Sequence, residues 1–474
     1  MKILYAASEA QPVAASGGLA DVAGSLPKAL VEEGHEACVV LPLYVNTIKQ
    51  QWRDQMTFVT SFSVPVGWRS QYCGLFTAEI NGVTYYFLDN EYYFKRDFGL
   101  YGYYDDAERY AFFSRAVLEM LTVIDFKPQV INSNDWQCAL IPVYYNIFYK
   151  HHHKLWGIKN MFTIHNIQYQ GRYGMEILED VLGIPRHFAS LLEYDRDVNL
   201  MKAAIEVSDK VTTVSPTYAR EIFDPWFSHG LDRALQDKAY KTCGFLNGID
   251  MDMYNPATDP VIPANFSTRS KAGKKVCKEK LLEEVGLPQG DEPVIGMISR
   301  LVEHKGFDLV KYVFDDIINL GYKVVILGSG EAQYEQFFHE MRWKYPDKVA
   351  FTCGYIPDLA KKIYAGADMF LMPSKSEPCG LAQMISLRYG TIPIVRKTGG
   401  LADSIIDCGD ENGTGYTFHS YNAHDMLASI ERAKNHYYNK AEWNKLVTRA
   451  MKADFSWKQS AKLYIGIYAE LCGE

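Results

Sequence analysis

Two cations stand five residues apart in one short segment of the chain. Residues 298–306 read Ile-Ser-Arg-Leu-Val-Glu-His-Lys-Gly, and the cations are Arg300 and Lys305. An arginine offers a planar fork of donors and a lysine a compact charge, so together they could offset the negative charge on a departing diphosphate. Taken alone, the segment is better explained as a pair of solvated surface charges.

A carboxylate, Glu377, lies in the loop 373–381, which is bounded by proline and glycine and follows the apolar run Met369–Met372. Ligands of open α/β sheets bind at the carboxyl ends of strands, which favours a functional role for this loop. Glu377 could bind sugar hydroxyls or stabilise positive charge on a sugar ring. The alternative is that it caps the helix expected to begin near Gly380.

Polar groups also end two apolar runs in the first half of the chain. His165 and Asn166 follow one run, and Asp135 and Trp136 follow the run before it. Side chains at these places could grip a sugar. A lone histidine is more often structural, and a lone tryptophan more often belongs to the core. Only the occurrence of these residues together favours a functional role.

A similar glycine turn occurs once in each half of the chain. Gly17 and Gly18 lie in Ala-Ser-Gly-Gly-Leu-Ala-Asp, and Gly399 and Gly400 lie in Lys-Thr-Gly-Gly-Leu-Ala-Asp. A glycine pair before a helix lets the backbone approach a ligand and points N–H groups at an anion such as phosphate. A turn without a ligand is the alternative for each copy, and the presence of two copies favours a site between two domains.

The elements that must position these groups alternate between β-rich runs and longer helical patterns, which predicts parallel strands with crossover helices. A turn at Asn247-Gly248 predicts a boundary near residue 243, after which the pattern restarts. We therefore expect two α/β domains. The expected elements of the first half are the helix 19–33 and the strands 3–7, 37–41, 129–132 and 160–164; the strands of the second half are 294–298, 323–327, 350–352, 369–372 and 392–395.

The composition of the 474 residues is that of a globular protein, with 48% hydrophobic and 22% charged residues. A net charge of −8 argues against a nucleic-acid-binding protein. The nine cysteines lack the spacing of a zinc site or a disulfide framework. Neither a signal peptide nor a membrane-spanning run is recognisable, so we expect a cytoplasmic protein that does not bind a membrane.

Three further motifs are weaker. Asp250-Met251-Asp252 has the D-x-D form of some metal sites but follows a hinge turn, so we expect no metal there. Gly328-Ser329-Gly330 lacks the third glycine of the dinucleotide fingerprint, which makes NAD binding a weak interpretation. The histidines at 151–153 are adjacent and cannot all face one ion, which favours a solvated basic cluster.

Taken together and in this order, these motifs resemble one family, the bacterial glycogen synthases and plant starch synthases, over almost the whole chain. These are retaining glycosyltransferases of the GT-B architecture, with two facing Rossmann-like domains. The residues that carry the resemblance are Ser8, Glu9, Pro12, 17–22, Asp135, Trp136, His165, Asn166, 247–250, Arg300, Lys305, Gly306, 377–381 and 398–401.

The resemblance implies a role for each site residue. On the nucleotide side, Arg300 and Lys305 would hold the diphosphate, Gly399 and Gly400 after Thr398 would offer it N–H groups, and Tyr355 would stack on the base. On the sugar side the implied residues are His165, Asn166, Asn247, Glu377, Cys379, Gly380 and Leu381, with Gly17, Gly18, Asp21 and Asp135 nearby and Tyr101 and Trp136 toward the acceptor.

The resemblance also implies an activity and a domain plan. The reaction would transfer glucose from ADP-glucose, or from UDP-glucose, to an α-1,4-glucan with retention, by same-face attack and without a metal or other cofactor. The implied domains are an acceptor-side domain at 1–243, a nucleotide-sugar domain at 244–452 and a segment at 453–474 whose helix crosses back to the first domain.

One departure from the family pattern concerns the first glycine turn. The family commonly has Lys-Thr/Val-Gly-Gly-Leu there, and this chain has Ala15 in place of the lysine. The change removes a cation expected near the nucleotide sugar, so the sequence does not determine whether the donor is ADP-glucose or UDP-glucose. Gln137 also stands where the pattern often has histidine.

Two alternatives remain at this stage. A sucrose-, trehalose- or lipid-directed relative of the same architecture would often carry a second glutamate eight residues after the first, where this chain has Ile385. A noncatalytic glucan-binding protein is the other alternative. Its sugar-stacking surface could come from a crowded group of aromatic residues, although packing is the commoner use of such groups. That group is Tyr92, Tyr93, Phe94, Tyr101, Tyr103 and Tyr104.

Overall fold

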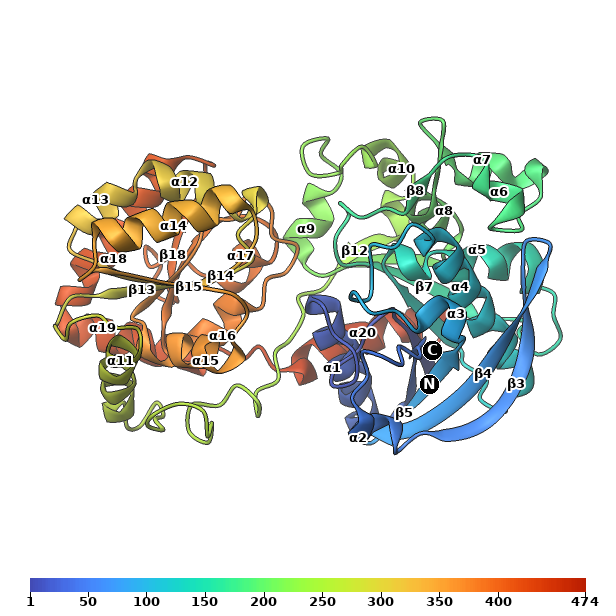
Figure 1. The fold of residues 1–474 in the computed structure, drawn as a ribbon, viewed down its shortest axis with the longest axis horizontal. Coiled ribbons are helices and arrows are strands. Elements are labelled where there is room, and N and C mark those ends of the chain that lie inside the picture. The colour runs from blue at the N-terminus through green and yellow to red at the C-terminus, as the bar shows by residue number, and fades with distance from the viewer. The chain divides into compact units, whose positions relative to one another are not determined.

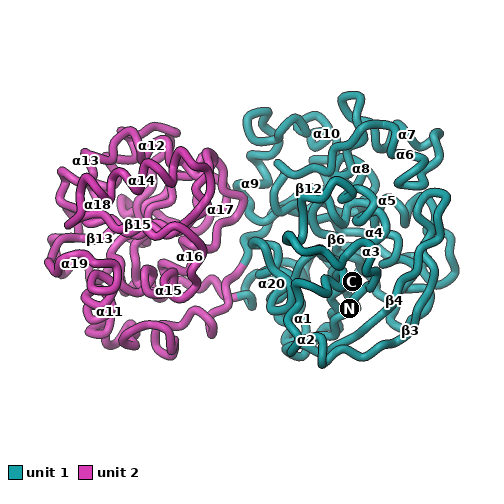
Figure 2. Tube along the Cα trace, viewed as in Figure 1, with its two compact units in different colours: residues 1–247, 457–474 teal, residues 248–456 magenta.

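The computed structural model describes all residues, 1–474, and divides into two compact units. Unit 1 comprises Met1–Asn247 together with Trp457–Glu474, and unit 2 comprises Gly248–Ser456 (Figure 2). The limits expected from the sequence lay after residues 243 and 452, so each observed limit falls a few residues further along the chain.

Unit 2 is built on a parallel sheet of six strands in the order β15-β14-β13-β16-β17-β18. The first strand of the unit, β13, lies in the middle of the sheet, and β14 and β15 follow on one side of it. The next strand, β16, pairs with the other side of β13, and β17 and β18 continue outward from there. The order therefore reverses between β13 and β16, which is where ligands bind in doubly wound sheets. The strands are β13 (Val294–Ile298), β14 (Lys323–Gly328), β15 (Val349–Cys353), β16 (Met369–Met372), β17 (Ile392–Arg396) and β18 (Tyr416–Phe418).

Unit 1 has a nine-stranded sheet in the order β12-β11-β7-β6-β1-β2-β5-β4-β3. Its pairings are parallel except at the end, where β4 pairs antiparallel with both β5 and β3. Its order reverses between β1 and β6. A small antiparallel sheet, β8-β10-β9, accompanies it. The strands are β1 (Lys2–Ala6), β2 (Glu36–Pro42), β3 (Thr57–Val66), β4 (Arg69–Ile80), β5 (Val83–Asp89), β6 (Val130–Asn134), β7 (Lys159–Ile164), β8 (Arg172–Tyr173), β9 (Glu193–Tyr194), β10 (Asp197–Asn199), β11 (Lys210–Thr213) and β12 (Thr242–Gly244).

Helices cover the sheets of both units (Figure 1). In unit 2, α12 to α14 lie on one side of the sheet, and α11, α15 and α16 lie on the other. Unit 1 has α1 (Gly18–Glu32), α2 (Gln50–Arg53), α3 (Glu91–Phe94), α4 (Asp106–Val123), α5 (Leu140–Tyr144), α6 (Ile177–Asp180), α7 (Ala189–Leu192), α8 (Leu200–Val207), α9 (Pro216–Glu221), α10 (Asp232–Gln236) and α20 (Trp457–Cys472). Unit 2 has α11 (Ala272–Glu284), α12 (Phe307–Tyr312), α13 (Phe314–Asn319), α14 (Ala332–Lys344), α15 (Pro357–Gly366), α16 (Ala382–Arg388), α17 (Gly399–Ser404), α18 (Ala423–Tyr438) and α19 (Lys440–Lys452).

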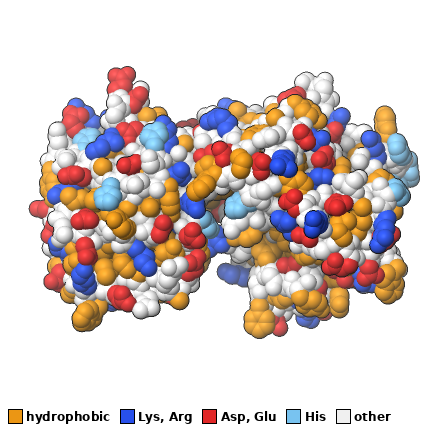
Figure 3. Space-filling view, turned by 90° about the horizontal axis from the view of Figure 1, so that it is seen from above, with side chains coloured by type: hydrophobic (Ala, Val, Ile, Leu, Met, Phe, Trp, Pro, Cys, Tyr) orange, Lys and Arg blue, Asp and Glu red, His pale blue; other side chains and the backbone are white.

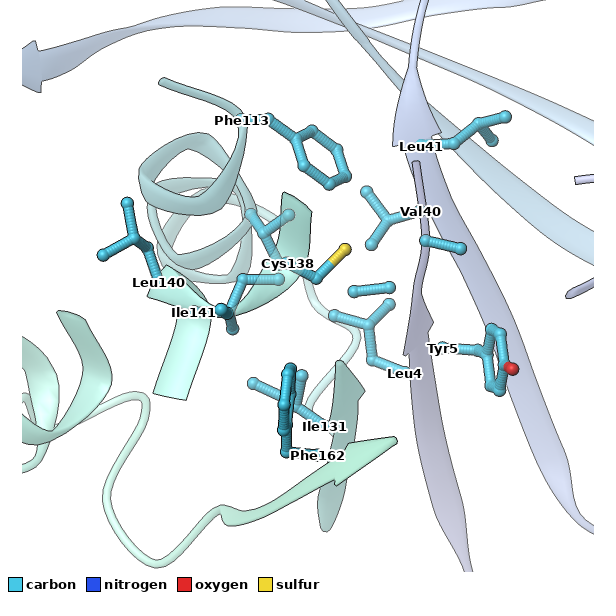
Figure 4. Packing of buried hydrophobic residues seen from close by; sticks show 14 of the residues in the cluster. Leu4, Tyr5, Val40, Leu41, Phe113, Ile131, Cys138, Leu140, Ile141 and Phe162 are labelled. Carbon is cyan, nitrogen blue, oxygen red and sulfur yellow. The ribbon is translucent and has the colours of Figure 1, made fainter. Parts of the chain in front are cut away.

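The core of unit 1 explains why its strands read as unbroken apolar runs. Leu4 and Tyr5 are neighbours on β1 and point to opposite faces of the sheet, and both are buried (Figure 4). On the Leu4 side the core includes Phe113 of α4, Ile131 of β6 and Phe162 of β7. A parallel sheet with helices on both faces must be apolar on both, so its strands lose the alternation of a half-exposed strand.

The last helix, α20, packs into unit 1. Its residues Trp457, Tyr464 and Tyr468 are buried in the same core as the sheet. The Asn132 side chain of β6 donates a hydrogen bond of 2.9 Å to the Tyr468 hydroxyl. This polar contact inside an apolar core fixes the position of α20 against the sheet, because a buried amide without a partner would be costly.

The surface is that of a mixed-charge protein. On the face shown in Figure 3, acidic and basic side chains are interspersed with apolar ones. No helix of the structure combines the length and apolar character needed to cross a lipid bilayer.

Candidate active site

In unit 2, the two strands at the reversal of strand order carry the predicted cations and carboxylate. Arg300 follows β13, Lys305 ends the short helix η5 (Glu303–Lys305), and Glu377 lies in the loop after β16. The Lys305 Nζ lies 3.0 Å from Oε1 and 2.7 Å from Oε2 of Glu377. The Ser374 hydroxyl donates to Glu377 Oε2 at 2.9 Å. Tertiary structure thus brings the two predicted sequence segments together.

Glu377 is ionised in this environment. It is buried, and burial by itself would raise the pKa of its carboxyl group. The Lys305 ammonium and the hydrogen bonds from Lys305 and Ser374 outweigh that effect and hold the pKa below its usual value. The carboxylate does not cap the following helix, which begins at Ala382. Sequence reasoning missed Ser374, whose only signal was its place in the same loop.

Arg300 differs from Lys305 because its charged group has no partner within the protein. Its side chain is exposed, and its guanidinium group makes no hydrogen bond or ion pair within the protein. The charges of both cations affect the pKa of the neighbouring His304. Burial, and then the charges of Lys305 and Arg300, lower the pKa of His304 to about 4 although Glu377 opposes them. The end of β13 is therefore a cluster of positive charge with one free guanidinium group.

The second glycine turn supports the Glu377 loop. A side chain at Gly399 would place its Cβ 1.9 Å from the Glu377 carbonyl oxygen, and one at Gly400 would lie 2.0 Å from that of Cys379. The Gly400 N–H donates to the carbonyl oxygen of Glu377 at 3.0 Å. This N–H group is thus used inside the protein, in contrast to the expectation that it serves a diphosphate. The glycines are needed here because two backbone segments approach closely.

The remaining predicted residues of unit 2 surround this loop. Cys379 is buried, and Gly380 has a φ of +71°, a left-handed conformation that favours glycine. Leu381 and Thr398 are the N-cap residues of α16 and α17. Gln383, which sequence reasoning missed, donates to the carbonyl oxygens of Cys379 and Gly380 at 3.1 and 2.9 Å.

Tyr355 lies in the loop after β15, at the same end of the sheet as the Arg300 and Glu377 loops. Its side chain is 86% exposed. An exposed ring at the carboxyl edge of the sheet has a free face on which a planar base can stack.

In unit 1, Asp135 and His165 meet at the carboxyl ends of β6 and β7. The Asp135 Oδ1 accepts the N–H groups of His165 and Asn166, at 2.7 and 3.4 Å. The His165 Nε2 lies 2.9 Å from Oδ1 of Asn134. Burial lowers the pKa of His165 to about 3, so its imidazole ring is neutral near pH 7. Burial raises the pKa of Asp135 to about 7, although the two N–H groups oppose the rise.

The first glycine turn already holds an anionic group of the protein. The Glu9 carboxylate accepts the N–H groups of Ser16 and Gly17. Burial raises the pKa of Glu9 despite these hydrogen bonds, and it raises that of Asp21, in the first turn of α1, to about 6. A side chain at Gly18 would meet no atom within 4 Å. The two glycine turns are alike in sequence but differ in what their N–H groups bind.

Three other predicted residues of unit 1 have different surroundings. Trp136 is in the core, edge-on to Tyr110 with ring centroids 5.3 Å apart, so it supports the site by packing. The Tyr101 hydroxyl lies 2.7 Å from the Ser8 hydroxyl. Asn247 follows β12 at the end of unit 1's first segment; it is buried, and its Oδ1 has no hydrogen-bond partner within the protein.

Two known protein families match the two halves of the chain. Residues 2–237 match the family described as the starch synthase catalytic domain, and residues 279–448 match glycosyl transferases group 1. The sucrose-phosphate synthase of Thermosynechococcus elongatus has a TM-score of 0.63 over 100% of this chain and 99% of its own, at 15% identity, which shows the fold. The fold and the site thus define this chain as a glycosyltransferase of the GT-B class, with two Rossmann-like domains.

Closer relatives define the family. The glycogen synthase of Anoxybacillus flavithermus is 47% identical over 99% of this chain and 98% of its own length. That of Clostridium acetobutylicum is 46% identical over 99% of both. The catalytic domain of starch synthase IV from Arabidopsis thaliana, bound to ADP and acarbose, has a TM-score of 0.91 at 34% identity and covers 100% of this chain and 99% of its own. The chain belongs to the glycogen synthase and starch synthase family of glucosyltransferases.

Proposed function

We propose that this protein transfers glucose from ADP-glucose to the 4-hydroxyl group at the non-reducing end of an α-1,4-glucan, with retention of the anomeric configuration. The observation that carries the proposal is the Lys305–Glu377 ion pair beside the free guanidinium group of Arg300, at the reversal of strand order in unit 2. The starch synthase relative bound to ADP supports the choice of donor. UDP-glucose is the alternative donor.

On the donor side, Arg300 and Lys305 bind the diphosphate and Tyr355 stacks on the adenine. Arg300 suits this task because its fork of donors is not engaged elsewhere in the protein. Lys305 has three N–H donors and contacts both oxygens of Glu377, so it can bridge the carboxylate and a phosphate oxygen. Thr398 and Gly399 belong to the same proposed site. Gly400 supports it through the backbone of Glu377.

On the sugar side, Glu377 and the backbone of Cys379, Gly380 and Leu381 orient the glucosyl ring. The neutral imidazole ring of His165 suits a sugar hydroxyl better than a phosphate, because it brings no charge. Asn247 has an unused buried acceptor for a hydroxyl group. The remaining unit 1 residues of this proposed site are Gly17, Gly18, Asp21, Asp135 and Asn166, with Tyr101 and Trp136 toward the acceptor.

In the proposed reaction, the bond between the glucosyl C1 and the phosphate oxygen breaks, and a bond from C1 to the acceptor oxygen forms on the same face. ADP leaves with the electron pair and takes the proton of the acceptor hydroxyl. The protein contributes position and relief of the charge that develops on the diphosphate. We place the reaction in the cytoplasm, where the nine unpaired cysteines would stay reduced.

The test is incorporation of labelled glucose into glycogen from ADP-glucose and UDP-glucose in parallel, with EDTA present. We expect transfer from ADP-glucose that falls by about a thousandfold in Arg300→Ala. Arg269→Ala, at another exposed arginine of unit 2, is the matched control and should leave transfer unchanged. Glucan binding without transfer from either donor would instead indicate a noncatalytic glucan-binding protein.

A further inference from the structure

The segment between α3 and α4, residues 95–105, has no regular structure and is tied down by one buried arginine. Arg109 is fully buried. Its Nε donates to the Tyr93 carbonyl oxygen at 2.8 Å, and its Nη1 donates to that of Leu100 at 3.1 Å and to Asp106 Oδ1 at 2.5 Å. One side chain thus binds the helix before this segment, the middle of the segment and the first residue of the helix after it. We refer to residues 95–105 as the aromatic loop.

Asp106 completes the clamp. Its Oδ2 accepts the N–H groups of Gly102 and Tyr103, at 2.8 and 3.2 Å. The Tyr110 hydroxyl donates to the Leu100 carbonyl oxygen at 3.0 Å. A planar guanidinium paired with a buried carboxylate gives a defined geometry to a loop that the sheet does not stabilise. The aromatic loop is therefore held in one conformation by α4.

The inner side of the aromatic loop reaches the candidate site. The Tyr101 hydroxyl contacts the Ser8 hydroxyl. Burial raises the pKa of Tyr101, and the nearby carboxyl groups of Glu9 and Asp135 raise it further. Tyr101 thus lies among the groups that the proposed function places on the acceptor side.

The outer side of the aromatic loop presents large rings to solvent. Phe98 is 86% exposed and Tyr104 is 91% exposed. The neighbouring ring of Tyr103 is fixed by two contacts: its hydroxyl accepts the Phe98 N–H at 2.8 Å, and the Arg109 guanidinium lies 4.7 Å from its ring centroid. Two exposed rings therefore sit on a preorganised support, which lowers the entropy cost of binding.

Three of the four charged side chains of the aromatic loop are in ion pairs, and the fourth, Asp97, is hydrogen-bonded. Lys95 pairs with Glu91, and Arg96 pairs with Asp105. The Asp97 carboxylate accepts from the Asn46 side chain at 2.7 Å. A surface of exposed rings with satisfied charges suits a neutral ligand, and a glucan is neutral and offers rings whose C–H groups form apolar faces.

We propose that the aromatic loop is an outer acceptor surface, on which Phe98 and Tyr104 stack against glucose units of an α-glucan beyond those at the reaction centre. This inference rests on the proposed function and adds the residues that determine preference for long acceptors. Arg109 and Asp106 are positioning residues, because they act through the conformation of the loop. The surface is continuous with the acceptor side through Tyr101.

The experiment compares Phe98→Ala/Tyr104→Ala with the unaltered enzyme on maltose, maltoheptaose and glycogen. We expect kcat/KM to fall about tenfold with maltoheptaose and glycogen, mostly through KM, and less than twofold with maltose. The donor KM should not change. Phe98→Trp/Tyr104→Trp should retain the preference for long acceptors. Tyr312→Ala, at a 73% exposed ring of unit 2, is the matched control.

Arg109→Lys tests the clamp. It keeps the charge but loses the fork, so it should raise the KM for maltoheptaose in the same way. Equal changes for maltose and maltoheptaose in the double alanine variant, or no change in either, would overturn the inference. If the unaltered protein transfers glucose to no acceptor, the proposed function fails, and calorimetric titration with maltoheptaose still decides: weaker binding by the double variant supports the surface, and equal binding rejects it.

Discussion

The Lys305 ammonium group lies within 3.0 Å of both carboxylate oxygens of Glu377, although 72 positions separate the two residues in the chain. The pair bridges the loops that follow β13 and β16, the strands between which the order of the sheet reverses. Each side chain has a function of its own in the proposed reaction, and each is also needed to keep the other's charge compensated in a buried place.

Removing Lys305 should affect stability as well as transfer. We expect Lys305→Met to lower the free energy of unfolding by about 3 kcal/mol at pH 7, because it leaves the Glu377 carboxylate buried without its cation. Lys305→Met/Glu377→Leu should recover most of that stability and remain inactive. Denaturant unfolding and the glucose-transfer assay measure the two effects. Lys344→Met, at an exposed ion pair with Asp315, is the control.

The pH dependence of the same pair has a defined sign. The folded pKa of Glu377 is below its unfolded value, so the stability that it contributes is present above the unfolded value of about 4.3 and is lost as pH falls through the folded one. The loss of unfolding free energy caused by Lys305→Met should therefore become smaller as the pH is lowered. A deficit that is equal at pH 7 and pH 4 would contradict this account.

The two glycine turns should respond differently to alanine. We expect Gly400→Ala to destabilise unit 2 by about 3 kcal/mol or more and to abolish transfer, because its Cβ would lie 2.0 Å from the Cys379 carbonyl oxygen. Gly18→Ala has open space at the first position of α1 and should keep or slightly raise stability. Thermal unfolding compares the two variants. Equal destabilisation in both would contradict the difference in packing.

Restoring the lysine of the family pattern should act on donor binding. Ala15 is exposed and precedes the turn whose N–H groups bind Glu9. We expect Ala15→Lys to lower the KM for ADP-glucose several-fold with little change in kcat, because a cation near the diphosphate binds ground state and transition state alike. Steady-state kinetics with both nucleotide sugars provide the measurement. A large change in kcat at constant KM would refute it.

Asp135 should make the protein less stable as pH rises. Its folded pKa of about 7 lies above the unfolded value of about 3.9, so its favourable contribution is complete below the unfolded value and is lost as pH rises to the folded one. We expect Asp135→Asn to gain about 2 kcal/mol of unfolding free energy relative to the unaltered protein between pH 5 and pH 8. Urea titrations at the two pH values measure the gain. The control variant is Asp358→Asn, at an exposed aspartate in the first turn of α15.

Much of the fold was predictable because its signals are local. The runs at 294–298 and 369–372 form strands with the predicted limits, and the helix expected at 19–33 is α1 (Gly18–Glu32). Buried parallel strands are short, continuous apolar runs bounded by turns, which sequence alone reveals. The restart of the pattern predicted two α/β domains, and the family resemblance, confirmed by relatives at 46–47% identity, added the GT-B architecture.

The roles of individual site residues depended on contacts that local patterns do not encode. The sequence alone determined the class of protein, the strands β1, β2, β6, β7 and β13 to β17, and the segments that carry Arg300, Lys305, Glu377, Asp135 and His165, because residue types, spacing and periodicity are properties of the chain. Only tertiary structure decided that Lys305 pairs with Glu377, that Glu9 occupies the first glycine turn while the second supports a loop, and that Arg109 clamps the aromatic loop. Pairing, burial and close backbone approach join residues far apart in the chain, so they exist only once the elements have packed.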